Sequence, residues 1–172
     1  MNIVLIGYRG TGKSTVGKVL ARRLGWPVVS TDAEIVAREG KPIPEIVAQQ
    51  GWDYFRDVEA AVCQDMGTRD RVIIDTGGGA ILREANVQAL KRQGRLFWLT
   101  ADVSTIVRRI GGDTERPSLT GTKSFTEEVE EVLAQRLPKY RAAADVTVAT
   151  DGKTIDALVD QILAQFSTAS PA

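Results

Sequence analysis

The sequence contains no histidine and only one cysteine, Cys63, among its 172 residues. Without histidine, no imidazole can act as a general base, a metal ligand or a member of a serine–histidine catalytic arrangement. A single cysteine excludes an intrachain disulfide and a zinc site built from several thiolates. Any chemistry must therefore depend on carboxylates, lysine, arginine and backbone amides.

Net charge and long apolar runs are also absent. Lys plus Arg and Asp plus Glu each total 22, so no overall field attracts nucleic acid. No apolar run approaches the roughly 20 residues of a membrane span, and residues 1–7 lack the pattern of a signal peptide. We therefore expect a cytoplasmic protein without a nucleic-acid or membrane partner. Because the sequence shows no coiled-coil heptads or long apolar edge, we also expect a monomer.

Short apolar runs alternate with amphipathic segments along the chain. Strands are predicted at residues 3–6, 27–29, 72–74, 96–99 and 146–148. Helices are predicted at about 13–24, 32–66 with breaks near residues 40–42 and 51, 82–92, 103–110, 126–144 with a kink or break at Pro138, and 155–166. This alternation predicts a three-layer α/β/α sandwich with a five-stranded parallel sheet and right-handed crossovers.

The segment at about 111–125 is rich in Gly, Thr, Ser and charged residues and has no periodicity. Such a length is unusual for a structureless loop in a compact domain, so it predicts a mobile lid with Gly111, Gly112 and Gly121 as hinges. A disordered insertion is the alternative interpretation. We expect one domain over residues 1–166 that includes this lid, followed by a frayed tail at 167–172.

Residues 7–14, Gly-Tyr-Arg-Gly-Thr-Gly-Lys-Ser, match the Walker A pattern and lie between a predicted buried strand and a helix. The glycines allow successive amides to point at phosphate oxygens, Lys13 can reach the β and γ phosphates, and the Ser14 hydroxyl suits Mg²⁺. This context disfavours a chance glycine-rich turn. The expected nucleotide-binding residues are Gly10, Thr11, Gly12, Lys13, Ser14 and Thr15. GTPases, motor ATPases and small-molecule kinases share the motif, so it does not define the acceptor.

Further clusters follow the predicted strand ends, the edge at which open α/β sheets bind ligands. In chain order they are Asp32, Phe55-Arg56-x-x-Glu59, Gly77-Gly78-Gly79, Arg116-Pro117 and Arg136-x-Pro138-x-Tyr140. Together with the Walker A motif, their order and spacing resemble the shikimate kinase family over nearly the whole chain. Related gluconate and adenylate kinases lack the combination of Phe-Arg-x-x-Glu and three glycines.

The resemblance implies a P-loop kinase that transfers the γ-phosphoryl group of ATP to the 3-hydroxyl of shikimate with Mg²⁺, in the pathway to chorismate and the aromatic amino acids. It implies that Asp32 binds and orients the acceptor hydroxyls, and that Arg56 and Arg136 bind the shikimate carboxylate. Glu59 would hold Arg56 in place.

The resemblance further implies that Gly78 and Gly79 face the substrate, that Arg116 closes over the phosphates, and that Arg109 contacts the adenine side. The expected catalytic residues are thus Lys13, Asp32 and Arg116. The alternatives are structural: Asp32 could be only a helix N-cap, and each arginine only a solvated surface side chain.

One position departs from the family pattern, which usually has Asp-x-Asp after the second strand. Here the segment is Ser30-Thr31-Asp32, so the first carboxylate, which assists Mg²⁺, is missing. Asp75 ends the third predicted strand, where family members commonly have a small residue. We therefore expect Ser14 and Asp75 to be the metal residues. A strand-end capping aspartate is the alternative.

The same departure leaves two other functions open. One is a kinase of the same fold that acts on another polyhydroxy acid, such as gluconate. The other is a nucleotide-dependent binding or regulatory protein that has lost catalysis. Retention of Asp32, Arg56, Arg116 and Arg136 argues against the loss of catalysis.

Overall fold

A computed structural model describes residues 1–111 and 125–168 of the chain. The expected lid falls mainly on residues 112–124, and Arg116 therefore lies outside the described residues. The last four residues of the expected tail also lie outside them, whereas Ser167 belongs to the last helix. Within the described part of the chain, no helix has the length and apolar character required to cross a membrane.

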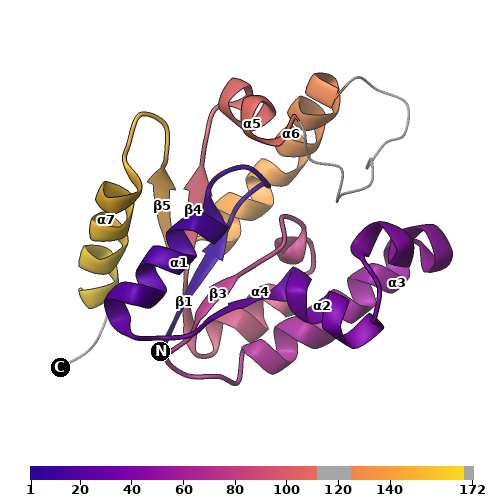
Figure 1. The fold of residues 1–172 in the computed structure, drawn as a ribbon, viewed down its shortest axis with the longest axis horizontal. Helices are drawn as coiled ribbons and strands as arrows, with labels where there is room; N and C mark the ends of the chain where they lie inside the picture. Colours follow the sequence, from indigo (N-terminus) through magenta and orange to yellow (C-terminus); the bar gives the residue numbers. More distant parts are fainter. Residues whose placement is uncertain (112–124, 169–172) are drawn as a thin grey trace.

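Five parallel strands form one sheet in the order β2-β3-β1-β4-β5 (Figure 1). The strands are β1 (Asn2–Ile6), β2 (Val28–Ser30), β3 (Ile73–Asp75), β4 (Gly94–Thr100) and β5 (Val146–Ala149). Every residue of β1 is buried, as the continuous apolar run predicts for a central parallel strand. The predicted α/β fold with a five-stranded parallel sheet is confirmed.

Helices cover both faces of the sheet (Figure 1). One face carries α1 (Lys13–Leu24) and α7 (Ile155–Ser167), and the other carries α2 (Thr31–Glu39), α3 (Ile43–Met66), α4 (Glu84–Lys91) and α6 (Phe125–Ala143). Alternate residues of β1 serve the two layers: Ile3 and Leu5 pack with α1 and α7, and Val4 and Ile6 with the opposite helices. The short helix α5 (Val103–Ile110) packs against α6.

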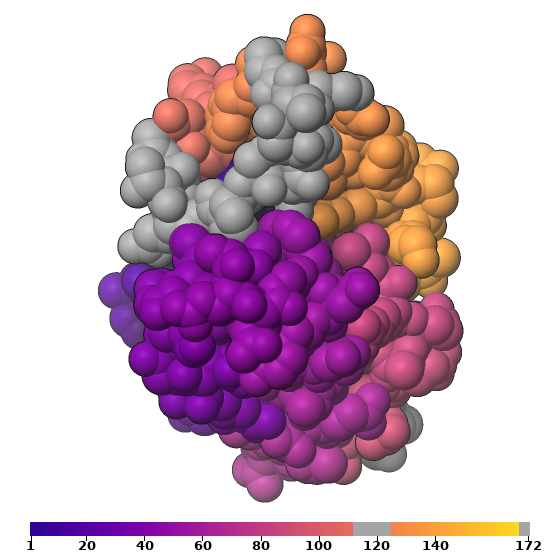
Figure 2. Space-filling view, turned by 90° about the vertical axis from the view of Figure 1, so that its right-hand side faces the viewer, coloured from indigo at the N-terminus to yellow at the C-terminus, as the bar shows by residue number. Residues whose placement is uncertain are grey.

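On the face shown in Figure 2, α2 and α3 form the lower part in purple, and α6 lies above in orange. Helices α2 and α3 thus share one face of the molecule with α6, which lies far from them in the sequence. The break between α2 and α3 occurs at Gly40, with a φ of 68°, and Gly51 interrupts α3 with a φ of 86°. Both positions were predicted because glycine adopts positive φ without steric cost.

Two predicted elements differ from the structure. The expected helix at 82–92 is divided into a 3₁₀ turn, η1 (Ala80–Leu82), and α4, because Arg83 is extended. The Asn86 side chain donates to the Ala80 carbonyl and fixes this division. The prediction of a break at Pro138 is wrong, because α6 continues through this residue. Buried residues on both sides of Pro138, including Arg136 and Tyr140, hold the helix against the molecule despite the lost backbone hydrogen bond.

Leu5→Ala tests the central position of β1. Leu5 is completely buried between β3 and β4, so this truncation should lower the free energy of unfolding by about 3 kcal/mol. Urea unfolding measures the change. Val36→Ala, at a 37% exposed position on α2, is the control and should change stability by less than about 0.5 kcal/mol. Equal effects of the two substitutions would contradict this account of the core.

Candidate active site

The loop between β1 and α1 is folded around backbone carbonyls that face Lys13. Lys13 Nζ donates to the carbonyls of Gly7 at 2.8 Å and Tyr8 at 3.0 Å, and Thr11 Oγ1 also donates to the Tyr8 carbonyl at 2.8 Å. Gly10 has a φ of 81°, and a Cβ there would lie 2.7 Å from Ile110 Cγ2. The loop therefore requires glycine at this position, and Lys13 is held over its centre.

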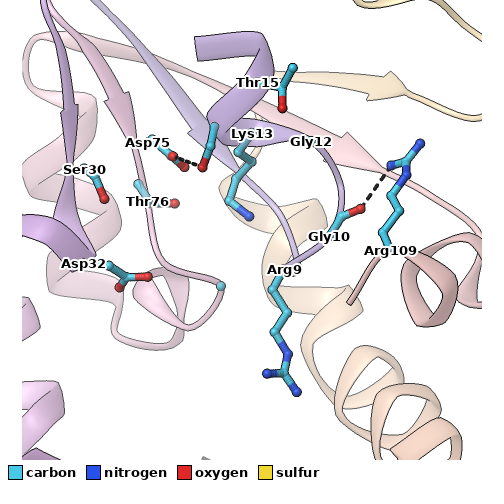
Figure 3. Close-up of a pocket in the computed structure, with 12 residues that line it drawn as sticks. Arg9, Gly10, Gly12, Lys13, Thr15, Ser30, Asp32, Asp75, Thr76 and Arg109 are labelled. Carbon is cyan, nitrogen blue, oxygen red and sulfur yellow. Dashed lines mark hydrogen bonds between the residues drawn. The ribbon is translucent and has the colours of Figure 1, made fainter. Parts of the chain in front are cut away.

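A cavity of about 450 Å³ opens over this loop (Figure 3). It is lined by Arg9, Gly10, Gly12, Lys13, Ser14, Thr15, Ser30, Asp32, Asp75, Thr76, Gly78 and Arg109. Asp32, Ser30 and Asp75 lie on one side of Lys13, and Arg109 lies on the other. Residues predicted separately from the ends of three strands are thus brought to one cavity at the carboxyl edge of the sheet.

Asp75 lies beside the phosphate loop rather than capping its own strand end. Its Oδ2 accepts a 2.6 Å hydrogen bond from Ser14 Oγ (Figure 3). Asp75 is also the register partner of Ser30 on the neighbouring strand. A carboxylate is therefore present one strand away from the position at which the family pattern has its first aspartate.

Ser30, and not Asp32, caps α2. The Ser30 hydroxyl accepts from the Ala33 amide at 3.2 Å, so the structural alternative for Asp32 is wrong. Asp32 lies in the first turn of α2, and its carboxylate faces the turn after β3. A Cβ at Gly77 would lie 2.7 Å from Asp32 Oδ1 and 3.3 Å from Glu59 Oε2. Glycine at this position thus allows two carboxyl groups to approach the same turn.

Arg56 is held on α3 by a buried carboxyl group and two aromatic rings. Its Nη1 donates to Glu59 Oε1 at 2.8 Å, which confirms the predicted contact. Its guanidinium lies 5.4 Å from the Trp52 ring centroid and 5.2 Å from that of Phe55. A Cβ at Gly79 would overlap the same guanidinium, so only glycine permits this approach.

Arg136 reaches the glycine turn from α6. A Cβ at Gly78 would lie 3.4 Å from Arg136 Nη1, and the Tyr140 hydroxyl donates to the Gly78 carbonyl. Arg136 is 8% exposed, so it is not an ordinary solvated surface arginine. Two guanidinium groups from separate helices therefore lie near one turn, beside Asp32, and form a local site for an anion although the chain has no net charge.

Burial changes the acidity of several groups near this turn. It raises the pKa of Glu59, an effect that the Arg56 guanidinium partly opposes. Burial also raises the pKa of Tyr140 to about 12, so its hydroxyl stays protonated and able to donate. The pKa of Cys63 is raised to about 12 by burial, so the thiol remains protonated and unreactive at neutral pH.

Arg109 lies against the phosphate loop. Its Nη1 donates to the Gly10 carbonyl at 3.0 Å from the end of α5, and its side chain lines the cavity (Figure 3). Thr11 differs from the other loop residues, because its buried hydroxyl bonds within the loop. The Thr11 hydroxyl is therefore already engaged within the loop, whereas its backbone amide is not part of this contact.

Sequence reasoning missed three residues near the site. Arg9 and Thr76 line the cavity, and Tyr8 lies under Arg136 with its ring centroid 5.8 Å from the guanidinium carbon. Arg9 and Tyr8 occupy variable positions of the Walker A pattern, so the motif gave no reason to assign them. Thr76 follows Asp75 directly, and its hydroxyl donates to the Leu5 carbonyl at 2.9 Å.

Three features define a P-loop kinase that acts on a small anionic molecule. They are a phosphate loop after the central parallel strand, a carboxylate beside its serine, and the adjoining arginines Arg56, which is partly buried, and Arg136, which is buried. Comparison with known proteins specifies the family. The family model described as "Shikimate kinase" matches residues 9–167. The chain belongs to the shikimate kinase family, whose members are ATP-dependent phosphotransferases that use Mg²⁺.

Individual relatives agree with this assignment. The chain is 42% identical to the shikimate kinase of Syntrophus aciditrophicus, over 97% of this chain and 91% of the relative. A solved shikimate kinase from Acinetobacter baumannii, in complex with shikimate, has a TM-score of 0.92 and 32% identity, covering 99% of this chain and 95% of the other. A gluconokinase from Sinorhizobium meliloti has a TM-score of 0.56 and 19% identity, over 97% and 91% of the two chains, and shares the fold alone.

Glu59→Gln tests the buried carboxyl group. A folded-state pKa raised above the usual 4.5 means that the folded protein binds the proton more tightly than the unfolded chain. The stabilisation is complete below the unfolded pKa and is lost as the pH rises through the folded pKa. The wild type should therefore lose stability relative to Glu59→Gln as the pH is raised from 4.5 towards neutrality.

Urea unfolding at a series of pH values measures this difference. Glu45→Gln, an exposed position on the same helix, is the control and should give a nearly constant difference from the wild type. A constant difference for Glu59→Gln as well would show that the Glu59 carboxyl titrates normally.

Proposed function

We propose that this protein transfers the γ-phosphoryl group of ATP to the 3-hydroxyl of shikimate. The observation that carries the proposal is the approach of Arg56 and Arg136 to the Gly78–Gly79 turn beside Asp32. An acceptor that carries one carboxylate and several hydroxyls matches these charges. The Acinetobacter baumannii relative was solved in complex with shikimate, which supports this acceptor.

The two arginines provide orientation as well as affinity. Planar guanidinium groups bind a carboxylate through paired N–H donors, which restricts how the attached ring can lie. Because Arg56 is fixed by Glu59 and by two aromatic rings, little ordering remains to be done when the acceptor binds. Such positioning is the main requirement of phosphoryl transfer.

Asp32 is the proposed partner of the attacking hydroxyl. It lines the cavity on the side that faces Lys13 (Figure 3). A carboxylate at this place can accept a hydrogen bond from the hydroxyl, orient its oxygen towards the phosphate and take its proton as the new bond forms. Gly78 and Gly79 are proposed to face the acceptor, since a side chain at Gly79 would displace Arg56.

The proposed nucleotide site comprises Gly10, Thr11, Gly12, Lys13, Ser14, Thr15 and Arg109. Amides of the loop and the beginning of α1 face the phosphates, and Lys13 Nζ exchanges the carbonyls of Gly7 and Tyr8 for phosphate oxygens. Arg109 is proposed on the adenine side. Arg116, which lies outside the described residues, is retained as the arginine that stabilises the transferred phosphoryl group, on sequence grounds alone.

The residues beside the loop suit Mg²⁺. Ser14 and Asp75 supply a hydroxyl and a carboxylate, the hard oxygen donors that this ion prefers, and the two are already 2.6 Å apart. Among the described residues, no group of three acidic, cysteine or histidine side chains forms a complete protein cage. This fits an ion that keeps several waters. When bound there, Mg²⁺ would neutralise charge on the phosphates.

Asp75→Asn tests the proposed metal residue. Loss of the carboxylate should raise the Mg²⁺ concentration needed for half-maximal turnover by about tenfold or more, at constant ATP. Asp160→Asn, an exposed surface carboxylate bonded to Arg23, is the control and should leave this concentration unchanged.

The Ser30→Asp, Asp75→Ser exchange provides a second test, because the two positions are register partners. The exchange should recover much of the Mg²⁺ affinity lost in Asp75→Asn. Binding of ADP measured with and without Mg²⁺ gives the same information without turnover. An unchanged Mg²⁺ dependence in Asp75→Asn would remove Asp75 from the metal site.

ADP release with shikimate, with gluconate and without an acceptor tests the acceptor itself. Shikimate should stimulate turnover far above the other two conditions. Arg136→Ala should lower kcat/KM for shikimate by roughly 100-fold, because the carboxylate loses a buried charged donor. The affinity for ADP should change little.

The control for this variant is Arg141→Ala, at an exposed arginine on the same helix, which should retain wild-type kcat/KM. Stimulation by gluconate alone would establish the alternative kinase. Absence of stimulation by any acceptor would favour a nucleotide-binding protein without catalysis. The expected monomer, cytoplasmic location and lack of nucleic-acid or membrane partners rest on the sequence and remain predictions.

A further inference from the structure

Tyr8 is the second residue of the phosphate loop, yet its side chain does not line the phosphate-side cavity. The ring is 1% exposed and packs in an apolar cluster with residues of α5 and α6, namely Ile106, Ile110, Val129 and Val132. A loop residue with its ring buried between two helices has a role beyond shaping the loop, because a small aliphatic side chain would satisfy the backbone equally well.

The face of the Tyr8 ring is directed at Arg136. The guanidinium carbon of Arg136 lies 5.8 Å from the ring centroid, within the range of a cation–π interaction. Both side chains are almost fully buried, at 1% and 8% exposure. Because water is largely excluded from both partners, the attraction is stronger than at an exposed site.

The two acceptor-side arginines are held in different ways. Arg56 forms an ion pair with Glu59, which uses one of its N–H donors. Among the described residues, Arg136 forms no ion pair, and the Tyr8 ring lies against it instead. A ring face attracts the positive charge without accepting its N–H groups in the plane. The Tyr140 hydroxyl also interacts with Arg136, and the remaining N–H donors are left for a carboxylate.

The backbone of Tyr8 belongs to the nucleotide side. Its carbonyl accepts from Lys13 Nζ and Thr11 Oγ1 at 3.0 and 2.8 Å. Tyr8 therefore links the two sides of the site. Its carbonyl is held within the phosphate loop, and its ring contacts Arg136 on the acceptor side.

We propose that Tyr8 is a positioning residue for the acceptor, whose ring holds the Arg136 guanidinium in the orientation that receives the acceptor carboxylate. The inference rests on the proposed function, in which Arg136 binds that carboxylate. The ring and not the hydroxyl carries the effect, because the Tyr8 hydroxyl has no hydrogen-bond partner among the described residues. Tyr8→Phe should therefore behave as the wild type.

The experiment compares Tyr8→Leu with Tyr8→Phe. Leucine keeps an apolar side chain in the cluster but removes the ring face, so kcat/KM for shikimate should fall by about 3- to 10-fold. The kcat/KM of Tyr8→Phe for shikimate should stay within about twofold of the wild-type value. In both variants the dissociation constant of ADP should also stay within about twofold of the wild-type value. If leucine impairs folding, Tyr8→Met, which is apolar and unbranched, replaces it and should give the same fall in kcat/KM of about 3- to 10-fold.

A double-mutant cycle with Arg136→Gln shows whether the effect passes through Arg136. In the Arg136→Gln background, Tyr8→Leu should have no further effect on kcat/KM for shikimate. Val129→Ala is the control for loss of packing, since it lies in the same cluster almost two turns before Arg136, and it should leave kcat/KM unchanged.

Three results would overturn the inference while shikimate turnover remains intact in the wild type. The first is an unchanged kcat/KM for shikimate in Tyr8→Leu. The second is a loss of ADP affinity in Tyr8→Leu as large as its loss of kcat/KM. The third is persistence of the Tyr8→Leu effect in the Arg136→Gln background. Absence of shikimate turnover in the wild type would instead contradict the proposed function, and this inference with it.

Discussion

Burial of β1 on both faces is the constraint on which the site depends. A strand packed between two helical layers and paired with β3 and β4 has one position, so its carboxyl end fixes the phosphate loop. Parallel pairing then places the ends of β2 and β3 at the same edge. Asp75 and Ser30 arrive there as register partners, and Asp75 meets Ser14 at 2.6 Å.

The acceptor side depends on the absence of side chains. Gly77, Gly78 and Gly79 allow groups from α2, α3 and α6 to approach one turn, and a Cβ at Gly77 or Gly79 would obstruct this approach. The buried Glu59 carboxyl is stabilised by Arg56, and the raised pKa of Glu59 shows that burial outweighs this attraction. The turn therefore combines close packing with positive charge, as recognition of a small carboxylate requires.

Much of this arrangement could be predicted from the sequence, because its signals are local. The buried run before Gly7 predicts the central strand, the Walker A pattern predicts the loop, and the spacing of Arg56 and Glu59 predicts their contact on one helix face. Tyr8 under Arg136 depends on tertiary packing, which spacing does not encode. The uninterrupted helix at Pro138 has the same cause. The cap of α2 is a local contact of Ser30 with the Ala33 amide, but Ser30 and Asp32 are both capping residue types, so the sequence alone does not decide between them.

We propose that Asp32 and the two arginines, Arg56 and Arg136, present one particular hydroxyl of shikimate to the phosphate loop. The most direct measurement is phosphorus–proton correlation by nuclear magnetic resonance on the product formed from shikimate, ATP and Mg²⁺. We expect a single product with the phosphate on the 3-hydroxyl. Phosphate on another hydroxyl, or a mixture of products, would contradict the assigned orientation of the acceptor.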